Sequence, residues 1–187
     1  EYLESRGISE DVVRRYNITV QKNNENVLVF PFYDEQNILQ FVKYRKINFV
    51  KGVDKNKEWC ESDTMPILFG MNHCEDFSRL VITEGQIDSL SLATAGIKNA
   101  VSVPTGAKGF TWLSNCGGWI NKFDEIVVFG DCEKGKITLI ETLEKRLQKK
   151  VKCVRMEDYL CEKDANDILQ KYGKDALVKA VESAELR

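Results

Sequence analysis

The chain has 187 residues with 27 basic and 29 acidic side chains, so its formal net charge is −2. This length suffices for one large core or for a small lobe beside a standard domain, and the ordinary composition excludes disordered and fibrous classes. No apolar run approaches the ~20 residues of a membrane helix, and the near-neutral charge is no argument for nucleic acid by itself. Glu1 rather than Met begins the chain, which predicts a fragment of a longer protein.

Six cysteines and one histidine are the candidate soft metal ligands. None of the cysteines forms a C-x-x-C pair, which argues against a structural zinc site and against a disulfide framework. We therefore expect no zinc, reduced and mostly buried thiols, and a cytoplasmic protein. The cysteines are Cys60, Cys74, Cys116, Cys132, Cys153 and Cys161.

The first part of the chain combines short helices with a β-hairpin. Residues 1–18 predict two short helices, with Ser9 as the N-cap of the second. Strands are predicted over 27–33 and 38–47, and the polar cluster between them is typical of a turn. We therefore predict a small mixed α+β lobe over residues 1–76.

From residue 77 onward, predicted strands alternate with predicted helices. Short apolar runs predict strands over 80–83, 100–103, 126–129 and 151–156. Helices are expected over 86–95, 137–147, 165–172 and 176–184, and the glycine-rich stretch 105–122 is expected to be irregular. Such alternation predicts an α/β domain over 77–187, a parallel sheet with helices on both faces.

Acidic side chains follow several of these strands. Ligands of open α/β sheets bind outside the carboxyl ends of the strands, so the carboxylates are expected to converge on one rim. Like charges at ~3–6 Å repel unless they are protonated or neutralised, and a hard divalent cation neutralises them most simply. Two such ions suit in-line phosphoryl or nucleotidyl transfer. The candidate metal ligands are Glu84, Asp88, Asp131, Glu133 and Asp164.

Each of these residues alone is also consistent with a structural role. Asp88 fits the solvated start of a helix, Asp131 to Glu133 fit a polar turn before a helix, and Asp164 fits an N-cap. An E-G-x-x-D after one strand together with a D-x-E after a later strand is hard to obtain from capping alone. The combination therefore favours a metal site.

Basic and aromatic side chains are interleaved between residues 41 and 59. Single-strand binding needs basic residues along a phosphate track and aromatic platforms for bases. Lys43 and Arg45 share one face of the predicted strand, and Tyr44 lies on the other. The alternative is a solvated hairpin face whose aromatics belong to the core. The candidate nucleic-acid or nucleotide ligands are Lys43, Arg45, Lys57 and, in the glycine-flanked loop after Pro104, Lys108.

Several segments resemble TOPRIM primases. VITEGQIDSLS (81–91) resembles the first TOPRIM motif, and VVFGDCEKGK (127–136) resembles the second. SVPTGAKG (102–109) and KDANDIL (163–169) are similar to the primases of phage primase–helicases and of the mitochondrial replicative helicase. YLESRGIS and PILFGMN are similar to what precedes TOPRIM in those proteins, so the resemblance covers nearly the whole chain.

This resemblance implies a Rossmann-like TOPRIM domain and a DNA primase. Such an enzyme is a nucleotidyltransferase that joins ribonucleoside triphosphates into RNA primers on single-stranded DNA, with Mg²⁺ or Mn²⁺. It implies that Glu84 and Asp131 are catalytic, Glu84 as general acid/base or metal ligand and Asp131 as a metal ligand. Asp88 matches an acidic residue of the first motif, and Asp164 matches an acid that also lies near the metal. Glu133 stands where the second motif has an aspartate, which keeps the charge and lengthens the side chain by one methylene.

The resemblance also implies a replication protein of a bacterial or phage-infected cell, without a membrane partner. A helicase and a zinc-binding domain would act with it, in the parent protein or in trans. This stretch has neither G-x-x-x-x-G-K-[ST] nor zinc-ribbon spacing. Two alternatives stay open, a TOPRIM nuclease that cleaves phosphodiester bonds and a non-catalytic nucleic-acid-binding module. The primase-like lobe and the KDAN segment favour the primase.

Overall fold

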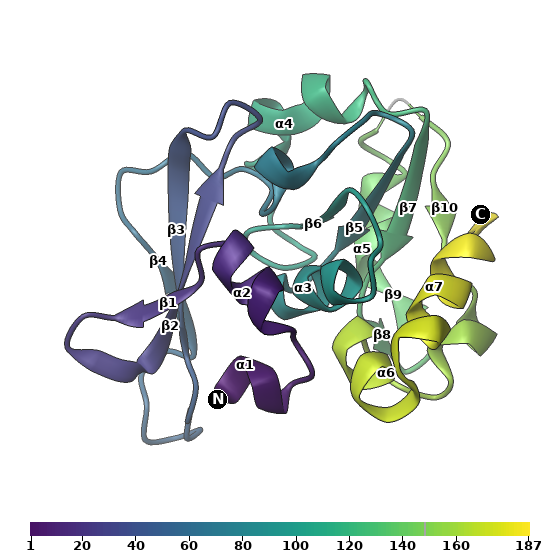
Figure 1. Cartoon of the computed structure of the whole chain (residues 1–187). Coiled ribbons are helices and arrows are strands. Elements are labelled where there is room, and N and C mark those ends of the chain that lie inside the picture. The colour runs from purple at the N-terminus through teal and green to yellow at the C-terminus, as the bar shows by residue number, and fades with distance from the viewer. Residues whose placement is uncertain (148) are drawn as a thin grey trace.

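The computed structural model describes residues 1–147 and 149–187, which form two main β-sheets with helices (Figure 1). The first sheet is antiparallel with the order β1-β2-β3-β4. Its strands are β1 (Thr19–Gln21), β2 (Asn24–Tyr33), β3 (Leu39–Lys46) and β4 (Glu58–Cys60). The predicted hairpin is therefore present, and two short strands extend it.

Alternation along β2 decides which face of this sheet is buried. Leu28, Phe30 and Phe32 point into the core because every second residue of a strand faces the same side. The Phe32 ring meets those of Phe41 and Phe69 edge-on, at centroid distances of 5.0 and 5.1 Å. This aromatic cluster joins the first sheet to the rest of the molecule.

Two short helices precede the sheet, α1 (Tyr2–Ser5) and α2 (Glu10–Arg15). Ser9 is the N-cap residue of α2 as predicted, but its side chain makes no capping bond. Instead, the backbone N–H of Ser9 donates to Thr94 Oγ1 at 3.2 Å. The N-terminal helices are thereby attached to the second half of the chain.

The second sheet has the order β11-β10-β7-β5-β6, with β5, β6, β7 and β10 parallel and β11 antiparallel at one edge. Its strands are β5 (Arg79–Thr83), β6 (Ala100–Ser102), β7 (Glu125–Phe129), β10 (Lys152–Cys153) and β11 (Glu185–Leu186). The predicted α/β class with a mostly parallel sheet is confirmed.

Helices cover both faces of this sheet, with α3, α6 and α7 on one side and α4 and α5 on the other (Figure 1). They are α3 (Gln86–Thr94), α4 (Leu113–Ile120), α5 (Thr138–Leu143), α6 (Ala165–Tyr172) and α7 (Lys174–Glu182). Smaller elements are the hairpin of β8 (Cys132–Glu133) and β9 (Lys136–Ile137) and the 3₁₀ turns η1 (Met71–His73) and η2 (Met156–Tyr159).

Four expectations from the sequence were wrong in detail. The stretch 105–122 is not irregular throughout, because Trp112, Cys116 and Ile120 bury one side of α4 despite its two glycines. The helix predicted over 137–147 ends at Leu143, and the strand predicted over 151–156 pairs at only two positions. The thiols are not mostly buried: all six cysteines are free, but only Cys116 is fully buried.

Phe69 connects the two sheets within one core. Its backbone exchanges two hydrogen bonds with Ser102 at 2.9 and 3.1 Å, while its ring packs against Phe30 and Phe32 of the first sheet. Buried apolar residues form one cluster from Leu3 to Ala184. The division into 1–76 and 77–187 stays a prediction. Among the described residues, no helix combines the length and hydropathy that crossing a bilayer requires.

Candidate active site

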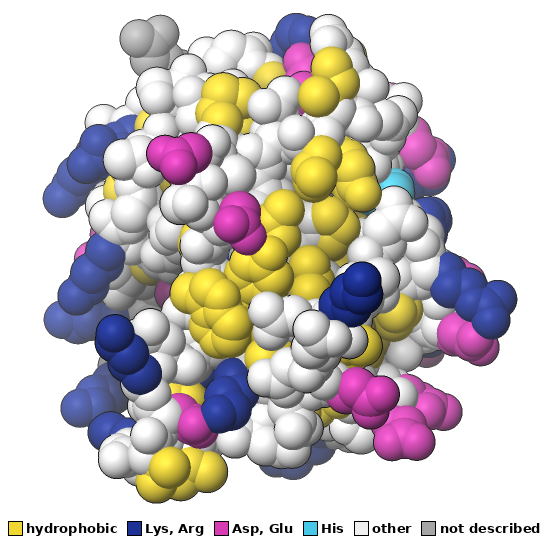
Figure 2. Space-filling view, turned by 90° about the vertical axis from the view of Figure 1, so that its left-hand side faces the viewer, with side chains coloured by type: hydrophobic (Ala, Val, Ile, Leu, Met, Phe, Trp, Pro, Cys, Tyr) yellow, Lys and Arg dark blue, Asp and Glu magenta, His cyan; other side chains and the backbone are white. Residues whose placement is uncertain are grey.

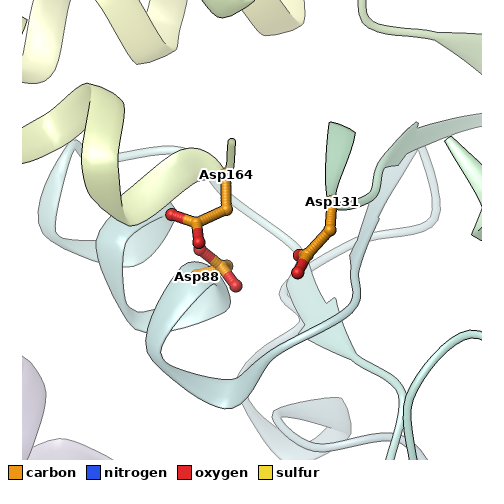
Figure 3. A group of neighbouring side chains, drawn as sticks. All are labelled: Asp88, Asp131 and Asp164. Atoms are coloured by element: carbon orange, nitrogen blue, oxygen red, sulfur yellow. The ribbon is translucent and has the colours of Figure 1, made fainter. Parts of the chain in front are cut away.

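Three aspartates from different elements meet at the carboxyl edge of the second sheet (Figure 3). Asp131 follows the end of β7, Asp88 lies in the first turn of α3, and Asp164 is the N-cap residue of α6. Each offers a carboxylate oxygen that lies within 4.8 Å of the others. We call Asp88, Asp131 and Asp164 the acidic cluster.

Local sequence places each member of the acidic cluster. The side chain of Asp88 folds back over Gly85, where a Cβ atom would lie only 2.7 Å from Asp88 Oδ2. Asp88 Oδ1 accepts the backbone N–H of Asn166 at 3.0 Å, and Asp164 Oδ1 accepts that of Asp167 at 2.9 Å. The N-termini of α3 and α6 therefore face each other across the cluster.

Burial and like charges raise the pKa of two carboxyls in this region, Asp88 and Glu84. The pKa of Asp88, which is only 7% exposed, lies well above its usual range because of burial and the charges of Asp164 and Asp131. Burial and the Asp131 charge also raise the pKa of Glu84. Backbone N–H groups of Asp131 and Ala107 partly offset that rise. Nearby positive charge therefore does not offset the burial and repulsion of these two carboxyls.

The donor set fits a hard divalent cation. All three ligands of the acidic cluster are carboxylate oxygens, and no Cys or His belongs to any group of possible metal ligands in the described parts of the chain. Among the residues that the structure describes, the buried Oδ1 atom of Asn166 has no hydrogen-bond partner, and Asn166 lines the same cleft as the three aspartates. Asp88, Asp131 and Asp164 would hold such a cation.

The other two predicted metal ligands lie outside the acidic cluster. Glu84 ends near it, at the end of β5, and lines the same hollow. Glu133 lies in the β8–β9 hairpin with a 72% exposed side chain, and its carboxylate contacts Lys163 Nζ at 3.3 Å. The structure thus brings three of the five carboxylates together, places Glu84 beside them and turns Glu133 toward a lysine.

A cleft of about 450 Å³ joins the acidic cluster to the first sheet. One wall carries the basic residues predicted from the hairpin, and the other carries the carboxylates. The lining includes Lys43, Arg45, Lys57, Glu84, Asp88, Asp131 and Asp164. Lys43 and Arg45 reach the cleft because they lie on the inner face of β3, paired with Phe30 and Leu28 of β2.

Glu58 of β4 holds the two basic residues of β3 in place. Its carboxylate lies 3.0 Å from Lys43 Nζ and 2.8 Å from Arg45 Nη1. Burial alone would raise the pKa of Glu58, but the charges of Lys43 and Arg45 outweigh it and lower that pKa. Lys43 is only 6% exposed, so this contact replaces most of its hydration.

Lys108 does not line this cleft. It lies with Thr105 and Thr138 in a second hollow of about 290 Å³, which also includes Glu84, Asp131 and Glu133. Glu84 and Asp131 line both hollows. The fourth predicted nucleotide ligand is thus on the other side of these two carboxylates from Lys43 and Arg45.

The aromatic side chains of the basic stretch do not line the cleft, and one of them, Phe41, lies in the core against Phe32. Tyr44 stacks on Trp59 at 5.6 Å on the outer face of the first sheet, opposite Lys43 and Arg45. Figure 2 shows hydrophobic side chains gathered across this outer face. The aromatic platforms that the sequence suggested therefore lie apart from the acidic cluster.

Several polar residues that line the cleft and contact its charged groups were not predicted from the sequence. Among them are Arg6, Glu58, Lys163 and Asn166. Arg6 and the two residues of the KDAN segment lie inside motifs that the sequence analysis quoted, which was the available signal. Glu58 had none, because its partners are more than ten residues away in the sequence.

Comparison with known proteins gives a family match and two similar plant proteins. Residues 81–169 match the family model described as Toprim-like. The chain is 28% identical over 206 residues to the primase homolog protein of Arabidopsis thaliana, covering 99% of this chain and 58% of that protein. It is 27% identical over 204 residues to the Twinkle homolog protein, chloroplastic/mitochondrial, of the same plant, covering 99% and 28%. The chain therefore spans less than two thirds of either relative.

Solved structures show the same fold. The primase fragment of the bacteriophage T7 primase-helicase protein superposes with a TM-score of 0.78 at 20% identity, over 95% of this chain and 72% of that one. The DnaG primase catalytic domain bound to single-stranded DNA gives 0.73 at 19% identity, over 99% and 71%. The resemblance inferred from the motifs is confirmed. Residues 81–169 match the Toprim-like family model, and the whole chain has a fold similar to that of primase catalytic cores.

Proposed function

We propose that this chain is the catalytic part of a DNA primase that joins ribonucleotides on single-stranded DNA in the presence of Mg²⁺ or Mn²⁺. The observation that carries the proposal is the cleft in which Lys43, Arg45 and Lys57 face the acidic cluster. Basic side chains bind phosphates, and a carboxylate-held cation acts where phosphoryl oxygens react, so both halves of nucleotidyl transfer are adjacent.

The residues of the cleft would have three different roles. Asp88, Asp131 and Asp164 would hold a divalent cation, which would supply charge stabilisation at the α-phosphate and the leaving pyrophosphate. Glu84, which has a raised pKa and lines the same cleft, would accept a proton from the attacking hydroxyl. Lys57, which has an exposed side chain, would orient a phosphate of template or nucleotide.

Glu58 competes with phosphate for Lys43 and Arg45 of β3. A phosphate that approaches Lys43 and Arg45 must share them with a carboxylate that already contacts both. Arg45 can do so, because its guanidinium has five N–H donors and only one contacts Glu58 in the structure. Arg45 is therefore the stronger candidate for the phosphate contact.

Partners and location belong to the proposal. The similar DnaG structure is described as bound to single-stranded DNA, and the T7 protein as a primase-helicase. We infer that this chain uses single-stranded DNA and ribonucleoside triphosphates, with a helicase and a zinc-binding domain in its parent protein or in trans. Work in the cytoplasm stays a prediction from the cysteine pattern.

The test is incorporation of labelled ribonucleotides on single-stranded DNA by the chain with Mn²⁺ or Mg²⁺, with and without an added zinc-binding domain. We expect short RNA products that disappear with excess EDTA and with Asp131→Asn. The same labelled strand reports cleavage. Shortened DNA without RNA would indicate a nuclease, and binding without either product would indicate a non-catalytic module; both would contradict the proposal.

A further inference from the structure

Both the side chain and the backbone of Lys163 contact the turn that carries Asp131. Its ammonium lies 2.8 Å from Asp131 Oδ2 and 3.3 Å from Glu133 Oε1. Its backbone carbonyl accepts the N–H of Cys132 at 2.7 Å. Because the backbone is held by the turn, the side chain has only to extend along it to neutralise both carboxylates.

The positive charge is confined to one side of the acidic cluster. Among the described residues, no ion pair involves Asp88 or Asp164, whereas Asp131 and Glu133 share Lys163. An ammonium and a divalent cation cannot use the same oxygen pair, and their like charges repel at such separations. The Asp88 side of Asp131 is therefore open to a cation, and the Glu133 side is occupied.

We propose that Lys163 is a positioning residue that occupies the Asp131–Glu133 pair and keeps a second divalent cation out of the free protein. One cation would bind at Asp88, Asp131 and Asp164, and a second would enter between Asp131 and Glu133 only when the ammonium leaves. This inference rests on the proposed function, because it concerns the same metal site.

A nucleoside triphosphate has the chemistry to displace the lysine. The Lys163 side chain is 47% exposed and lines the cleft that also holds Arg45 and Lys57. Phosphate oxygens would offer its ammonium another partner, and the carboxylates that it leaves would accept the cation that accompanies the nucleotide. Binding of the second cation would thus be coupled to binding of the substrate.

The experiment counts Mn²⁺ ions on the full chain by electron paramagnetic resonance of free Mn²⁺, without nucleotide or DNA. We expect one bound ion in the wild type and two in Lys163→Met, with the second at least about fivefold tighter than in the wild type, the upper range for a partly exposed charge pair. Lys163→Arg keeps the charge and should bind one. Lys171→Met removes an exposed lysine whose ion pair is with Glu162, so this variant should also bind one ion.

Further variants separate this inference from the proposed function. Adding Glu133→Gln to Lys163→Met should remove the second ion and leave the first. One ion in both the wild type and Lys163→Met, with equal affinities, overturns the role of Lys163 and leaves the primase proposal intact. No bound ion in any variant overturns both. If Lys163→Met fails to fold, Lys163→Gln with a polar side chain replaces it, with the same expectations.

Discussion

Asp88 reaches the acidic cluster because the residue three positions before it has no side chain. A Cβ atom on Gly85 would lie 2.7 Å from Asp88 Oδ2, well inside van der Waals contact. The backbone of Gly85 itself is extended, so other residues can adopt its conformation. The glycine of E-G-x-x-D thus serves the position of a carboxylate rather than a turn.

Gly85→Ala should separate the position of Asp88 from overall stability. We expect the Asp88 side chain to turn away, primer synthesis and Mn²⁺ affinity to fall about tenfold or more, and the free energy of unfolding to change by about 1 kcal/mol or less. Gly118→Ala is the matched control, because the same methyl group meets nothing within 4 Å there. Equal Mn²⁺ affinities of the two variants would contradict this role of Gly85.

Titration of the partly buried His73 should make the stability of the protein depend on pH. Burial and the Arg15 charge lower its pKa from 6.5 to about 4, and its ring packs on Tyr16 at 4.0 Å. The unfolded chain therefore binds this proton more readily than the folded chain between these two pH values. Stability from the neutral ring is complete above pH 6.5 and is lost as the pH falls toward 4.

The expected loss is about 1–2 kcal/mol after allowance for the partial exposure of the ring. Thermal unfolding from pH 7 to pH 4 should show this step in the wild type and not in His73→Gln. Because His73 is the only histidine, its imidazole signals in a nuclear magnetic resonance titration report the pKa directly. A midpoint near 6.5 in the folded protein would refute the prediction.

At the scale of elements, Asp164 has two roles at the start of α6. It accepts the backbone N–H of Asp167, as an N-cap does, and it belongs to the acidic cluster. The structural alternative considered for this residue is therefore correct, and it does not exclude the metal role. Asparagine caps a helix about as well as aspartate but has no charge.

Two substitutions at this position should therefore differ. Asp164→Asn should retain the melting temperature of the metal-free protein and lose much of its Mn²⁺ affinity. Asp164→Ala should lose both, with about 1 kcal/mol of stability removed with the cap, or roughly 2–4 °C in a chain of this size. Circular dichroism melting and Mn²⁺ titration measure the two effects, and equal melting temperatures would rule out the capping role.

The basic residues near the inner face of β3 differ in their suitability as probes of nucleic-acid binding. Lys43 is buried and paired with Glu58, so its removal would leave a half-buried carboxylate with one partner fewer and lower the stability. Arg45 and Lys57 are more accessible and line the same cleft. They are the better probes of nucleic-acid binding.

Arg45→Ala combined with Lys57→Ala should weaken single-stranded DNA binding and reduce its dependence on salt concentration, because fewer counterions are released. Lys150→Ala combined with Lys174→Ala removes the same charge at exposed positions outside the cleft and is the control. Fluorescence anisotropy at several salt concentrations measures both slopes. Identical slopes for the two double variants would mean that the cleft does not hold the strand.

At the scale of the whole molecule, one continuous core holds the two sheets together around the cleft. Phe69 takes part in both, through its backbone at the edge of β6 and its ring on the first sheet. The two walls of the cleft are therefore placed by shared packing. This arrangement allows a cation between β7, α3 and α6 to stabilise the entire fold by binding only the folded state.

Asp88→Asn tests this at the level of global stability. Because the pKa of Asp88 is raised in the folded protein, the stability that the neutral carboxyl confers is present below its usual pKa and lost as the pH rises through the raised value. Without metal, Asp88→Asn should thus have a higher melting temperature than the wild type at neutral pH. The free energy of unfolding should be larger by about 1–3 kcal/mol.

Mg²⁺ should reverse this order. At a hundred times its dissociation constant it would stabilise the wild type by about 2.7 kcal/mol, and it should stabilise Asp88→Asn less. Differential scanning calorimetry with EDTA and with Mg²⁺ measures both comparisons. Equal Mg²⁺ responses of the two proteins would mean that Asp88 does not contribute to cation binding.

The sequence by itself determined the α/β class, the succession of the main strands along the chain and the segment that matches the Toprim-like family. Strand periodicity and the motifs around Glu84, Asp131 and Asp164 are local properties, so they are readable without a structure. The shortness of α5 and β10 was not readable, because apolar spacing continues where the backbone already turns.

Only the tertiary structure decided which charges meet. Asp88 and Asp164 are separated by 75 intervening residues, and Lys43 and Glu58 by 14, so no pattern along the chain predicts their contacts. The same holds for the position of Lys163 between Asp131 and Glu133, which depends on the loop after η2 returning to the end of β7. Electrostatic interactions depend on distance in space, and the packing of β7, α3 and α6 sets that distance.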